Sequence, residues 1–430
     1  MHTHALPRRD FLAALGGAGA ILRSDATGTL GRLTSRVASL SPEEAAQQED
    51  YWLGVRQAFT IDANQINLNS GSVSPAPRVV ADAMHRYWTI TNLSPALYVD
   101  DLLYPEVELV RQRLAAAFGC DPEELALTRN TTESLHAVIF GLELQRGDEI
   151  VTTTQDYPSM LTAWRQRERR DGVVLKLVKY PTPPPSLDDL ALRIERAITP
   201  RTRVIHFCHM TYTSGQIFPV KRICQLARSR GIQTIVDGGH TFAQFPFRAA
   251  DLDCDYYGTS LHKWLTAPVG NGFLYVRKER IPAVWSLFAA PAELTDNIRK
   301  FETIGTYPIS LRNAVSDALT FHQAIGFERK AARFRLLRER WMRRVEGLKG
   351  VKLLTAYDPA QACALGALTI EGIGANALTD HLLKKHLVHV RPRFVPDEWE
   401  GIRVTPNVFT TLEEIDAFAA GIEHVVAHGV

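Results

Sequence analysis

Apolar and polar positions alternate in two distinct ways between residues 78 and 276. Short apolar runs predict buried strands, and longer segments with apolar residues every three to four positions predict helices. The predicted strands cover residues 125–128, 149–153, 173–178, 202–207, 232–237 and 273–276. The predicted helices precede or separate them, at residues 78–89, 106–118, 131–142, 159–169, 187–198 and 220–230. This alternation indicates an α/β fold with a mainly parallel sheet covered by helices on both faces.

The pattern changes at about residue 312, which indicates a second and smaller domain. Residues 316–344 have a long, charged helical pattern, and strand and helix patterns mix from there to residue 430. We therefore predict an N-terminal segment over residues 47–75, a large domain over 76–311 and a small α+β domain over 312–430. Residues 94–104, around Pro95 and Tyr98, are predicted to form a loop at the mouth of the functional site.

Composition places the chain among ordinary globular proteins. It has 430 residues, of which 45% are hydrophobic and 22% charged, and its formal net charge is +2. A charge so near zero gives no argument for a nucleic-acid or membrane partner. The five cysteines are scattered and show no Cys-x-x-Cys spacing, which argues against a disulfide framework or a metal site. Cys208 lies within an apolar run and is predicted to be a core residue.

The N-terminus carries a possible export signal. Arg8 and Arg9 precede Phe11-Leu12 and a short Gly/Ala-rich run that ends near residue 22. This pattern resembles a twin-arginine signal, and the apolar run is too short for an ordinary membrane anchor. The alternative is a disordered tail with a chance arginine pair. We predict a signal and disordered leader over residues 1–46 and a periplasmic or secreted protein, or a cytoplasmic one if the signal does not function.

Two residues at neighbouring strand ends suggest the chemistry. Asp237 stands at the carboxyl end of a predicted strand, where open parallel sheets bind ligands. Lys263 is surrounded by apolar and aromatic residues, and desolvation lowers the pKa of an amine. The alternative is a surface lysine at the end of a strand. An acid and a lysine so placed suit pyridoxal phosphate, because the lysine can bond the aldehyde and the acid can hold the pyridinium nitrogen.

The segments Val236-Asp237-Gly238-Gly239-His240 and Ser260-Leu261-His262-Lys263 resemble the class V aminotransferase family. Relatives in this family include cysteine desulfurases and isopenicillin N epimerases, and the resemblance extends from about Asn67 to the C-terminus. It implies a fold-type I pyridoxal phosphate enzyme in which Lys263 is the Schiff-base residue and Asp237 contacts the ring nitrogen. His240 would then lie against the phenolic oxygen of the cofactor, although a lone histidine is more often structural.

Residues 128–134 join a predicted strand to a helix, with Thr131 or Thr132 as the helix cap. Free N–H groups and the helix dipole make such a turn suitable for phosphate. The segment resembles the Gly-x-Thr-Glu loop of the family, which places Thr131 and Thr132 at the cofactor phosphate. Ser260 and His262 are expected to face the same phosphate. The alternative is an ordinary threonine cap.

Further cofactor contacts are implied by the resemblance alone. Tyr157 is the candidate for the aromatic ring that stacks on the cofactor, although it is nearly as consistent with a plain turn tyrosine. Tyr212 stands where the family has asparagine and would hydrogen-bond the phenolic oxygen. Gly305 and Thr306 resemble a Gly-Thr pair that reaches the phosphate of the partner subunit. This pair implies a homodimer with shared active sites, and the alternative is a simple loop.

The substrate end of the site is predicted from arginines. The stretch from Gly401 to Asn407 resembles the family segment whose arginine holds the substrate carboxylate, which assigns Arg403 to that role. Ser72 belongs to an N-terminal segment that lies beside the substrate in the family. Arg391 and Arg393 are further cations that could bind a second substrate carboxylate, although charged loop residues are usually just solvated.

The predicted function is pyridoxal phosphate chemistry at the α-carbon of a small amino-acid substrate, as an aminotransferase or an isopenicillin N epimerase-like epimerase. Desulfurases of the family attack with a cysteine shortly before the carboxylate-binding arginine, and residues 389–403 contain no cysteine. A C–S lyase remains an alternative. An exported binding protein that keeps the fold without catalysis is an alternative from another class.

Overall fold

The computed structural model describes residue 31 and residues 34–430. The predicted arginine signal at residues 7–22 therefore lies outside the described residues. Helix α2 (Pro42–Ala46) begins with a capping box at Ser41, buries Ala45 and Ala46, and packs on α14 (Phe327–Val345). The disorder predicted for the leader up to residue 46 therefore does not hold for residues 42–46. Helix α3 (Glu49–Arg56) follows directly.

A seven-stranded sheet forms the centre of the molecule, in the order β2-β8-β7-β6-β5-β3-β4. Its strands are β2 (Leu125–Thr128), β3 (Glu149–Thr153), β4 (Val174–Val178), β5 (Thr202–Cys208), β6 (Gln233–Asp237), β7 (Tyr256–Ser260) and β8 (Gly272–Val276). Within this sheet β8 alone runs opposite to the other strands, so its pairs with β2 and β7 are antiparallel. The mainly parallel sheet predicted from the sequence is thus confirmed, since β3 to β7 pair in parallel.

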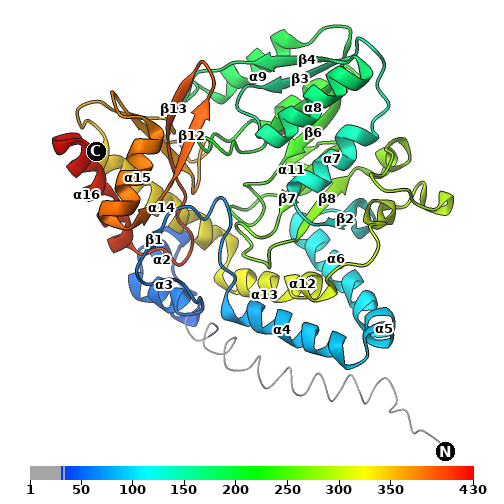
Figure 1. Ribbon diagram of the computed structural model, residues 1–430, viewed down its shortest axis with the longest axis horizontal. Helices are drawn as coiled ribbons and strands as arrows, with labels where there is room; N and C mark the ends of the chain where they lie inside the picture. Colours follow the sequence, from blue (N-terminus) through cyan, green and yellow to red (C-terminus); the bar gives the residue numbers. More distant parts are fainter. Residues whose placement is uncertain (1–30, 32–33) are drawn as a thin grey trace, which may run out of the picture.

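Helices cover both faces of this sheet (Figure 1). They are α6 (Tyr104–Phe118), α7 (Thr131–Gly141), α8 (Pro158–Asp171), α9 (Leu187–Ala197), α10 (Val220–Ser229) and the short α11 (Ala249–Leu252). Helix α4 (Arg78–Leu93) lies away from the sheet and packs on α12 (Ile309–Asn313) and α13 (Val315–Ile325) (Figure 1). Adjacent residues of β5 show the two-sided burial: Ile205 belongs to the core under α6, α9 and α10, and Val204 belongs to the core under α7 and α8. Burial on both faces explains why these strands are continuous apolar runs rather than alternating ones.

The predicted loop at residues 94–104 is wrong, because this segment is helical. Helix α5 (Pro95–Tyr98) continues through a π-helical turn (Val99–Leu103) into α6, and Leu103 is buried. Pro95 and Pro105 each stand in the first turn of a helix. Proline is tolerated there because the first N–H groups of a helix have no intrahelical partner.

The C-terminal part has its own antiparallel sheet, in the order β12-β13-β10-β9. Its strands are β9 (Val351–Leu353), β10 (Gly366–Ile370), β12 (Arg391–Val395) and β13 (Trp399–Val404), and the short β11 (Val388–His389) pairs in parallel with β1 (Ile66–Asn67). The helices are α12 (Ile309–Asn313), α13 (Val315–Ile325), α14, α15 (Ala375–His386) and α16 (Leu412–His428). Gly326, at φ 90°, separates α13 from α14.

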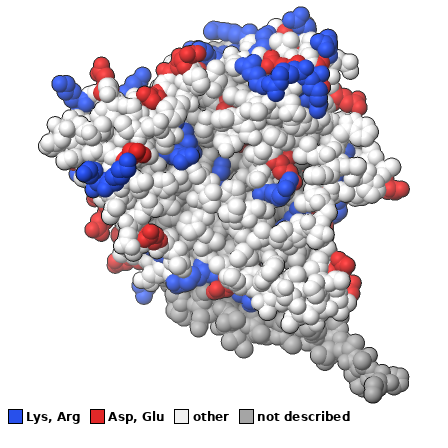
Figure 2. Space-filling view, viewed as in Figure 1, with Lys and Arg blue, Asp and Glu red and all other residues white. Residues whose placement is uncertain are grey.

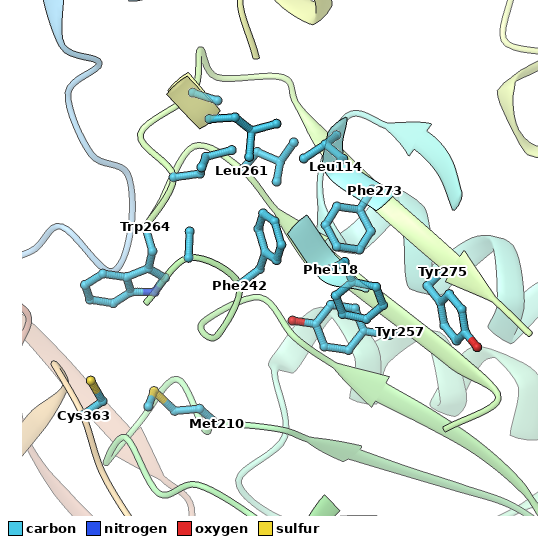
Figure 3. Packing of buried hydrophobic residues seen from close by; sticks show 14 of the residues in the cluster. Leu114, Phe118, Met210, Phe242, Tyr257, Leu261, Trp264, Phe273, Tyr275 and Cys363 are labelled. Atoms are coloured by element: carbon cyan, nitrogen blue, oxygen red, sulfur yellow. The ribbon is translucent and has the colours of Figure 1, made fainter. Parts of the chain in front are cut away.

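An aromatic core lies beneath the end of β7 that carries the predicted lysine. The ring of Phe118 lies 4.8 Å from that of Tyr257 and 5.2 Å from that of Phe273. Leu261 and Trp264 belong to the same cluster (Figure 3). These two side chains flank His262 and Lys263, so the loop that bears the lysine is fixed to the large core.

Charged side chains of both signs are scattered over the face shown in Figure 2, and most of that face is uncharged. None of the helices formed by residues 31 and 34–430 combines the length and apolarity that a membrane span requires. The same residues contain no cluster of His, Cys, Asp or Glu arranged to hold a metal ion.

Candidate active site

The carboxyl ends of the central strands and the β12–β13 hairpin enclose a cavity of about 310 Å³. The predicted site residues in its wall are Ser72, Thr131, Thr132, Tyr157, Tyr212, Asp237, His240, Ser260, His262, Lys263 and Arg403, and Arg391 and Arg393 lie there too. Sequence reasoning did not select Gly71, Asn130, Met210 and Gly239, which also contribute to the wall. Gly305 and Thr306 are not in the wall and are exposed. Residues 94–104 do not contribute to the wall either.

Asp237 is the last residue of β6 and lies on the floor of the cavity. One of its carboxylate oxygens accepts a hydrogen bond of 2.8 Å from the N–H of Gly239. Burial raises the pKa of Asp237 to about 6, although this hydrogen bond and the charge of Lys263 oppose the shift. A Cβ at Gly239 would lie 3.0 Å from both Asp237 Oδ1 and Thr131 Oγ1 and 3.5 Å from Lys263 Nζ. The glycine therefore keeps open the space between these groups.

Lys263 follows β7, and its Nζ lies 3.3 Å from Nε2 of His240. Burial lowers the pKa of Lys263 to about 8; Asp237 opposes the shift, and Arg403 and Arg393 add to it. Burial also lowers the pKa of His240 well below its usual value, so this imidazole is neutral and its Nε2 can accept a hydrogen bond from the lysine. The other ring nitrogen of His240, Nδ1, is buried without a partner.

The backbone around Lys263 is held from outside the cavity by a second buried lysine. Lys330 Nζ on α14 donates a 2.6 Å hydrogen bond to the carbonyl oxygen of Trp264 and lies 3.0 Å from Nδ1 of His322. Nε2 of His322 lies 2.8 Å from the hydroxyl of Thr266. No local pattern singles out Lys330, because it lies in a charged helix 66 residues away from Trp264.

The N-terminus of α7 faces the cavity, but its cap differs from the prediction. Asn130 is the N-cap, and its side-chain oxygen accepts from the N–H of Glu133 at 2.9 Å, so the assignment of the cap to Thr131 or Thr132 was wrong. The Thr131 hydroxyl instead lies 2.8 Å from that of Ser260, which also accepts from the Thr131 N–H. Helix dipole, N–H groups and hydroxyls at one point suit an anion.

Two tyrosines lie beside each other in the wall. The rings of Tyr157 and Tyr212 meet edge to face at 5.2 Å, and Arg393 lies over the Tyr212 ring at 5.2 Å. The carbonyl oxygen of Tyr212 accepts a 3.0 Å hydrogen bond from Arg403. Tyr212 thus connects the aromatic part of the wall to the arginines, an arrangement that its place in the sequence does not reveal.

Arg403 on β13 is fully buried and points into the cavity wall beside the N-terminal segment. Its Nη2 donates to Asn69 Oδ1 and to Ser72 Oγ, each at 3.0 Å, and its Nε has no partner. Burial, together with the charge of Arg393, holds the pKa of Arg403 well below its usual value. Sequence reasoning missed Asn69, although it stands within the N-terminal segment that was singled out.

Cys208 is buried, as predicted, but it also contributes to the cavity wall beside Asp237. Its thiol donates to the Asp156 carboxylate at 3.3 Å. Burial and the Asp156 charge raise the pKa of Cys208 well above the usual value. This cysteine is therefore a protonated thiol at neutral pH and a poor nucleophile.

The cavity fits a flat, anionic cofactor and an anionic substrate. It joins an anion-binding helix end, an acid–lysine pair and a buried arginine. His240 Nδ1, His262 Nδ1 and Arg403 Nε find no partner among residues 31 and 34–430. Buried polar atoms are normally paired, so these three atoms indicate polar groups that a ligand supplies. Fold and site together define a fold-type I pyridoxal phosphate enzyme.

The chain belongs to the aminotransferase class V family, whose model, described as Aminotransferase class-V, matches residues 66–392. The isopenicillin N epimerase of Amycolatopsis lactamdurans is 30% identical over 395 residues, covering 87% of this chain and 98% of its own. The prediction of pyridoxal phosphate as the cofactor is confirmed by membership of this family.

Two solved structures share the fold at low identity. A C-DES mutant with glycine covalently linked to its PLP cofactor has a TM-score of 0.74 at 22% identity and covers 85% of this chain and 98% of its own. The apo cysteine desulfurase from Thermococcus onnurineus has a TM-score of 0.76 at 21% identity and covers 87% of this chain and 97% of its own. Both likenesses concern the fold alone.

Proposed function

We propose that this protein acts at the α-carbon of an amino acid, as an aminotransferase or as an epimerase similar to isopenicillin N epimerase. One observation carries the proposal: Asp237 and Lys263, at two neighbouring strand ends, face the same cavity as Arg403 from the distant β12–β13 hairpin. Pyridoxal phosphate, when bound, withdraws electrons from the α-carbon and makes its proton removable.

Each end of the cavity suits one end of the cofactor. Asp237 would hold the ring nitrogen, because a carboxylate there stabilises the protonated ring. Lys263 would bond the aldehyde carbon, with His240 beside the phenolic oxygen. Tyr157 and Tyr212 would border the ring. The phosphate would lie among the N–H groups and side chains of Thr131, Thr132, Ser260 and His262.

Lys263 is suited to move the α-proton. With a pKa of about 8, roughly a tenth of its amine is unprotonated at pH 7, far more than for an ordinary lysine. The unprotonated amine would take the proton at Cα, and the ammonium would return a proton from the side on which Lys263 lies, whereas epimerisation would need a proton from the opposite side. Arg403 orients the substrate by holding the carboxylate with its fork of donors, while Asn69 and Ser72 fix the guanidinium.

A cysteine desulfurase is not proposed. Persulfide formation needs a mobile thiolate, and residues 389–403, which precede and include Arg403, contain no cysteine. Cys208 lies in the cavity but is bound to Asp156 as a thiol at the floor beside Asp237. C–S lysis ranks below proton transfer, because the likeness to C-DES is one of fold.

Incubation of the enzyme with single amino acids in heavy water tests the proposal. Deuterium at Cα, with a keto acid or the opposite stereoisomer formed, is expected for at least one of them. Conversion of cysteine to alanine through an enzyme-bound persulfide would overturn it, as would the absence of Cα exchange with every amino acid tried.

We also propose a homodimer in which Gly305 and Thr306 complete the partner's site. Both residues are exposed and lie outside their own chain's cavity, which supports this role. Light scattering is expected to give a dimer, and Thr306→Ala is expected to weaken cofactor retention. An active monomer at assay concentration contradicts the proposal.

For residues 1–46 we propose twin-arginine export. Fused to a reporter, this segment is expected to direct export that fails when Arg8 and Arg9 are both changed to lysine. Equal export by the double variant would contradict the proposal.

A further inference from the structure

Three arginines project from the β12–β13 hairpin into the cavity wall. The strands pair antiparallel, with Arg391 opposite Arg403 and Arg393 two residues further along β12. Side chains two residues apart, and those directly opposite, share a face of the sheet. Arg391, Arg393 and Arg403 accordingly all line the cavity. In Figure 1 the hairpin lies on the side of the small domain that faces the large sheet.

None of the three guanidinium groups has an acidic partner among residues 31 and 34–430. Arg403 donates only to Tyr212, Asn69 and Ser72, and Arg393 donates only to the carbonyl oxygens of Tyr212 and Pro392. No hydrogen bond or ion pair is formed by Arg391 within the described chain, and its side chain is exposed.

This arrangement works against the stability of the folded protein. Like charges directly opposite each other on two strands destabilise a sheet, and Arg391 faces Arg403 in this way. Burial lowers the pKa of Arg393 to about 10, and the charge of Arg391 adds to this shift. Elsewhere the chain pairs its buried arginines with acids, as Arg111 does with Glu302 and Arg333 does with Glu49. The unpaired set in the cavity therefore points to negative charge brought by a ligand.

A single carboxylate cannot accept hydrogen bonds from all three arginines at once. The fork of Arg403 and its partners Asn69 and Ser72 form one seat, which the proposed function gives to the α-carboxylate. Arg393 donates through Nε to the same Tyr212 carbonyl oxygen that Arg403 uses, lies over the Tyr212 ring at 5.2 Å, and has an Nη2 without a partner within the described chain. Arg391 lies opposite Arg403, and its side chain is exposed. Neither residue contacts Asn69 or Ser72, so Arg391 and Arg393 form a second seat on β12 beside that of Arg403.

Resting on the proposed function, we propose that the substrate carries a second carboxylate remote from its α-carbon, and that Arg393 and Arg391 bind it. The preferred substrates are dicarboxylic amino acids or larger amino acids with a distal carboxylate. Neutral side chains of the same length leave the second seat without a counter-charge and bind more weakly.

Calorimetric titration of the holoenzyme with unreactive acids tests the second seat without turnover. Succinate, glutarate, adipate and pimelate are each compared with the monocarboxylate of equal length. At least one dicarboxylate is expected to bind about 10- to 100-fold more tightly than its counterpart, since a charged hydrogen-bonded pair is gained. Arg393→Met and Arg391→Met are each expected to reduce this preference. Arg343→Met, which removes an arginine on the far side of the small domain's α14, is the control and keeps it.

The outcomes separate the two proposals. The second seat is overturned if the wild type binds dicarboxylates no more tightly than monocarboxylates. It is also overturned if the preference for dicarboxylates remains in both Arg393→Met and Arg391→Met. Either result holds even if Cα exchange occurs. A variant that loses pyridoxal phosphate while the preference stays unchanged shows that the arginines serve the cofactor phosphate, which also overturns it. Should Arg393→Met fail to fold, the exposed Arg391 position supplies the test. In the heavy-water assay, 2-aminoadipate is expected to exceed norleucine in kcat/KM, and Arg391→Met is expected to narrow that ratio.

Discussion

The two walls of the cavity differ in whether their charged groups are paired with groups of opposite charge. On the floor formed by the large sheet, the carboxylate of Asp237 and the ammonium of Lys263 stabilise each other, and the helix end at Thr131 is joined to Ser260. On the hairpin wall, Arg391, Arg393 and Arg403 have no acidic partner among the described residues 31 and 34–430.

The difference matches the ligands that the walls are proposed to hold. A resident cofactor meets preorganised groups whose charges are largely balanced, so the floor is stable before and after each reaction. A substrate that arrives and leaves must bring its own negative charge, so the arginines of the hairpin wall are left without acidic partners among the described residues. Association through such a wall gains from long-range attraction, which salt weakens.

The largest effect is expected on the floor. Lys263→Ala removes the residue proposed both to bond the cofactor and to act as the base, and Cα exchange is expected to fall by at least about 10³-fold. Borohydride reduction followed by peptide mapping should label Lys263 in the wild type and nothing in the variant. A variant that keeps the wild-type visible absorption band without added amines would contradict the assignment of Lys263 as the residue that bonds the cofactor.

On the hairpin wall, Arg403→Met is expected to lower kcat/KM for amino acids by about 10²- to 10³-fold, because a carboxylate loses its buried, charged donor. Cofactor absorbance should remain, since the arginine belongs to the other wall. Arg403→Lys restores the charge without the fork and is expected to recover part of the loss. Loss of the cofactor in the methionine variant would contradict the division into two walls.

The pH dependence of cofactor uptake tests the lowered pKa of Lys263 on the floor. Burial favours the neutral form of Lys263, so the reactive amine rises with pH through an apparent pKa near 8 instead of 10.5. Uptake of pyridoxal phosphate by the apoenzyme at pH 7 should then be on the order of 10²-fold faster than for an ordinary lysine. Stopped-flow absorbance between pH 6 and 10 measures it, and a rate still rising steeply above pH 9 would contradict the lowered pKa.

The smallest effect is expected for Cys208→Ala. This change removes one hydrogen bond from a thiol, a weak donor, to the Asp156 carboxylate, and a net contribution of about 1 kcal/mol corresponds to only a few-fold in rate. Steady-state Cα exchange is the measurement. A loss of more than about 10²-fold would mean that the thiol takes part in chemistry, as no bystander hydrogen bond has such an effect.

Local patterns predicted the large sheet well. The strands at 125–128 and 149–153 are found at their predicted bounds, because residues buried on both faces leave a continuous apolar run in the sequence. The helical segment at 94–104 was mistaken for a loop because Pro95 was taken as a breaker. A helix tolerates proline in its first turn. Only the conformation of the surrounding backbone shows whether a proline begins a helix or interrupts one.

The sequence by itself determined the chemistry of the floor. Asp237 and Lys263 could be predicted because each lies at a strand end, in a short segment whose pattern is local. The tertiary structure alone decided the rest: Asn69 meets Arg403 across 334 positions, and Lys330 on a distant helix holds the carbonyl of Trp264. Such pairs are set by how whole elements pack, and packing depends on the shape of the complete core rather than on any short segment.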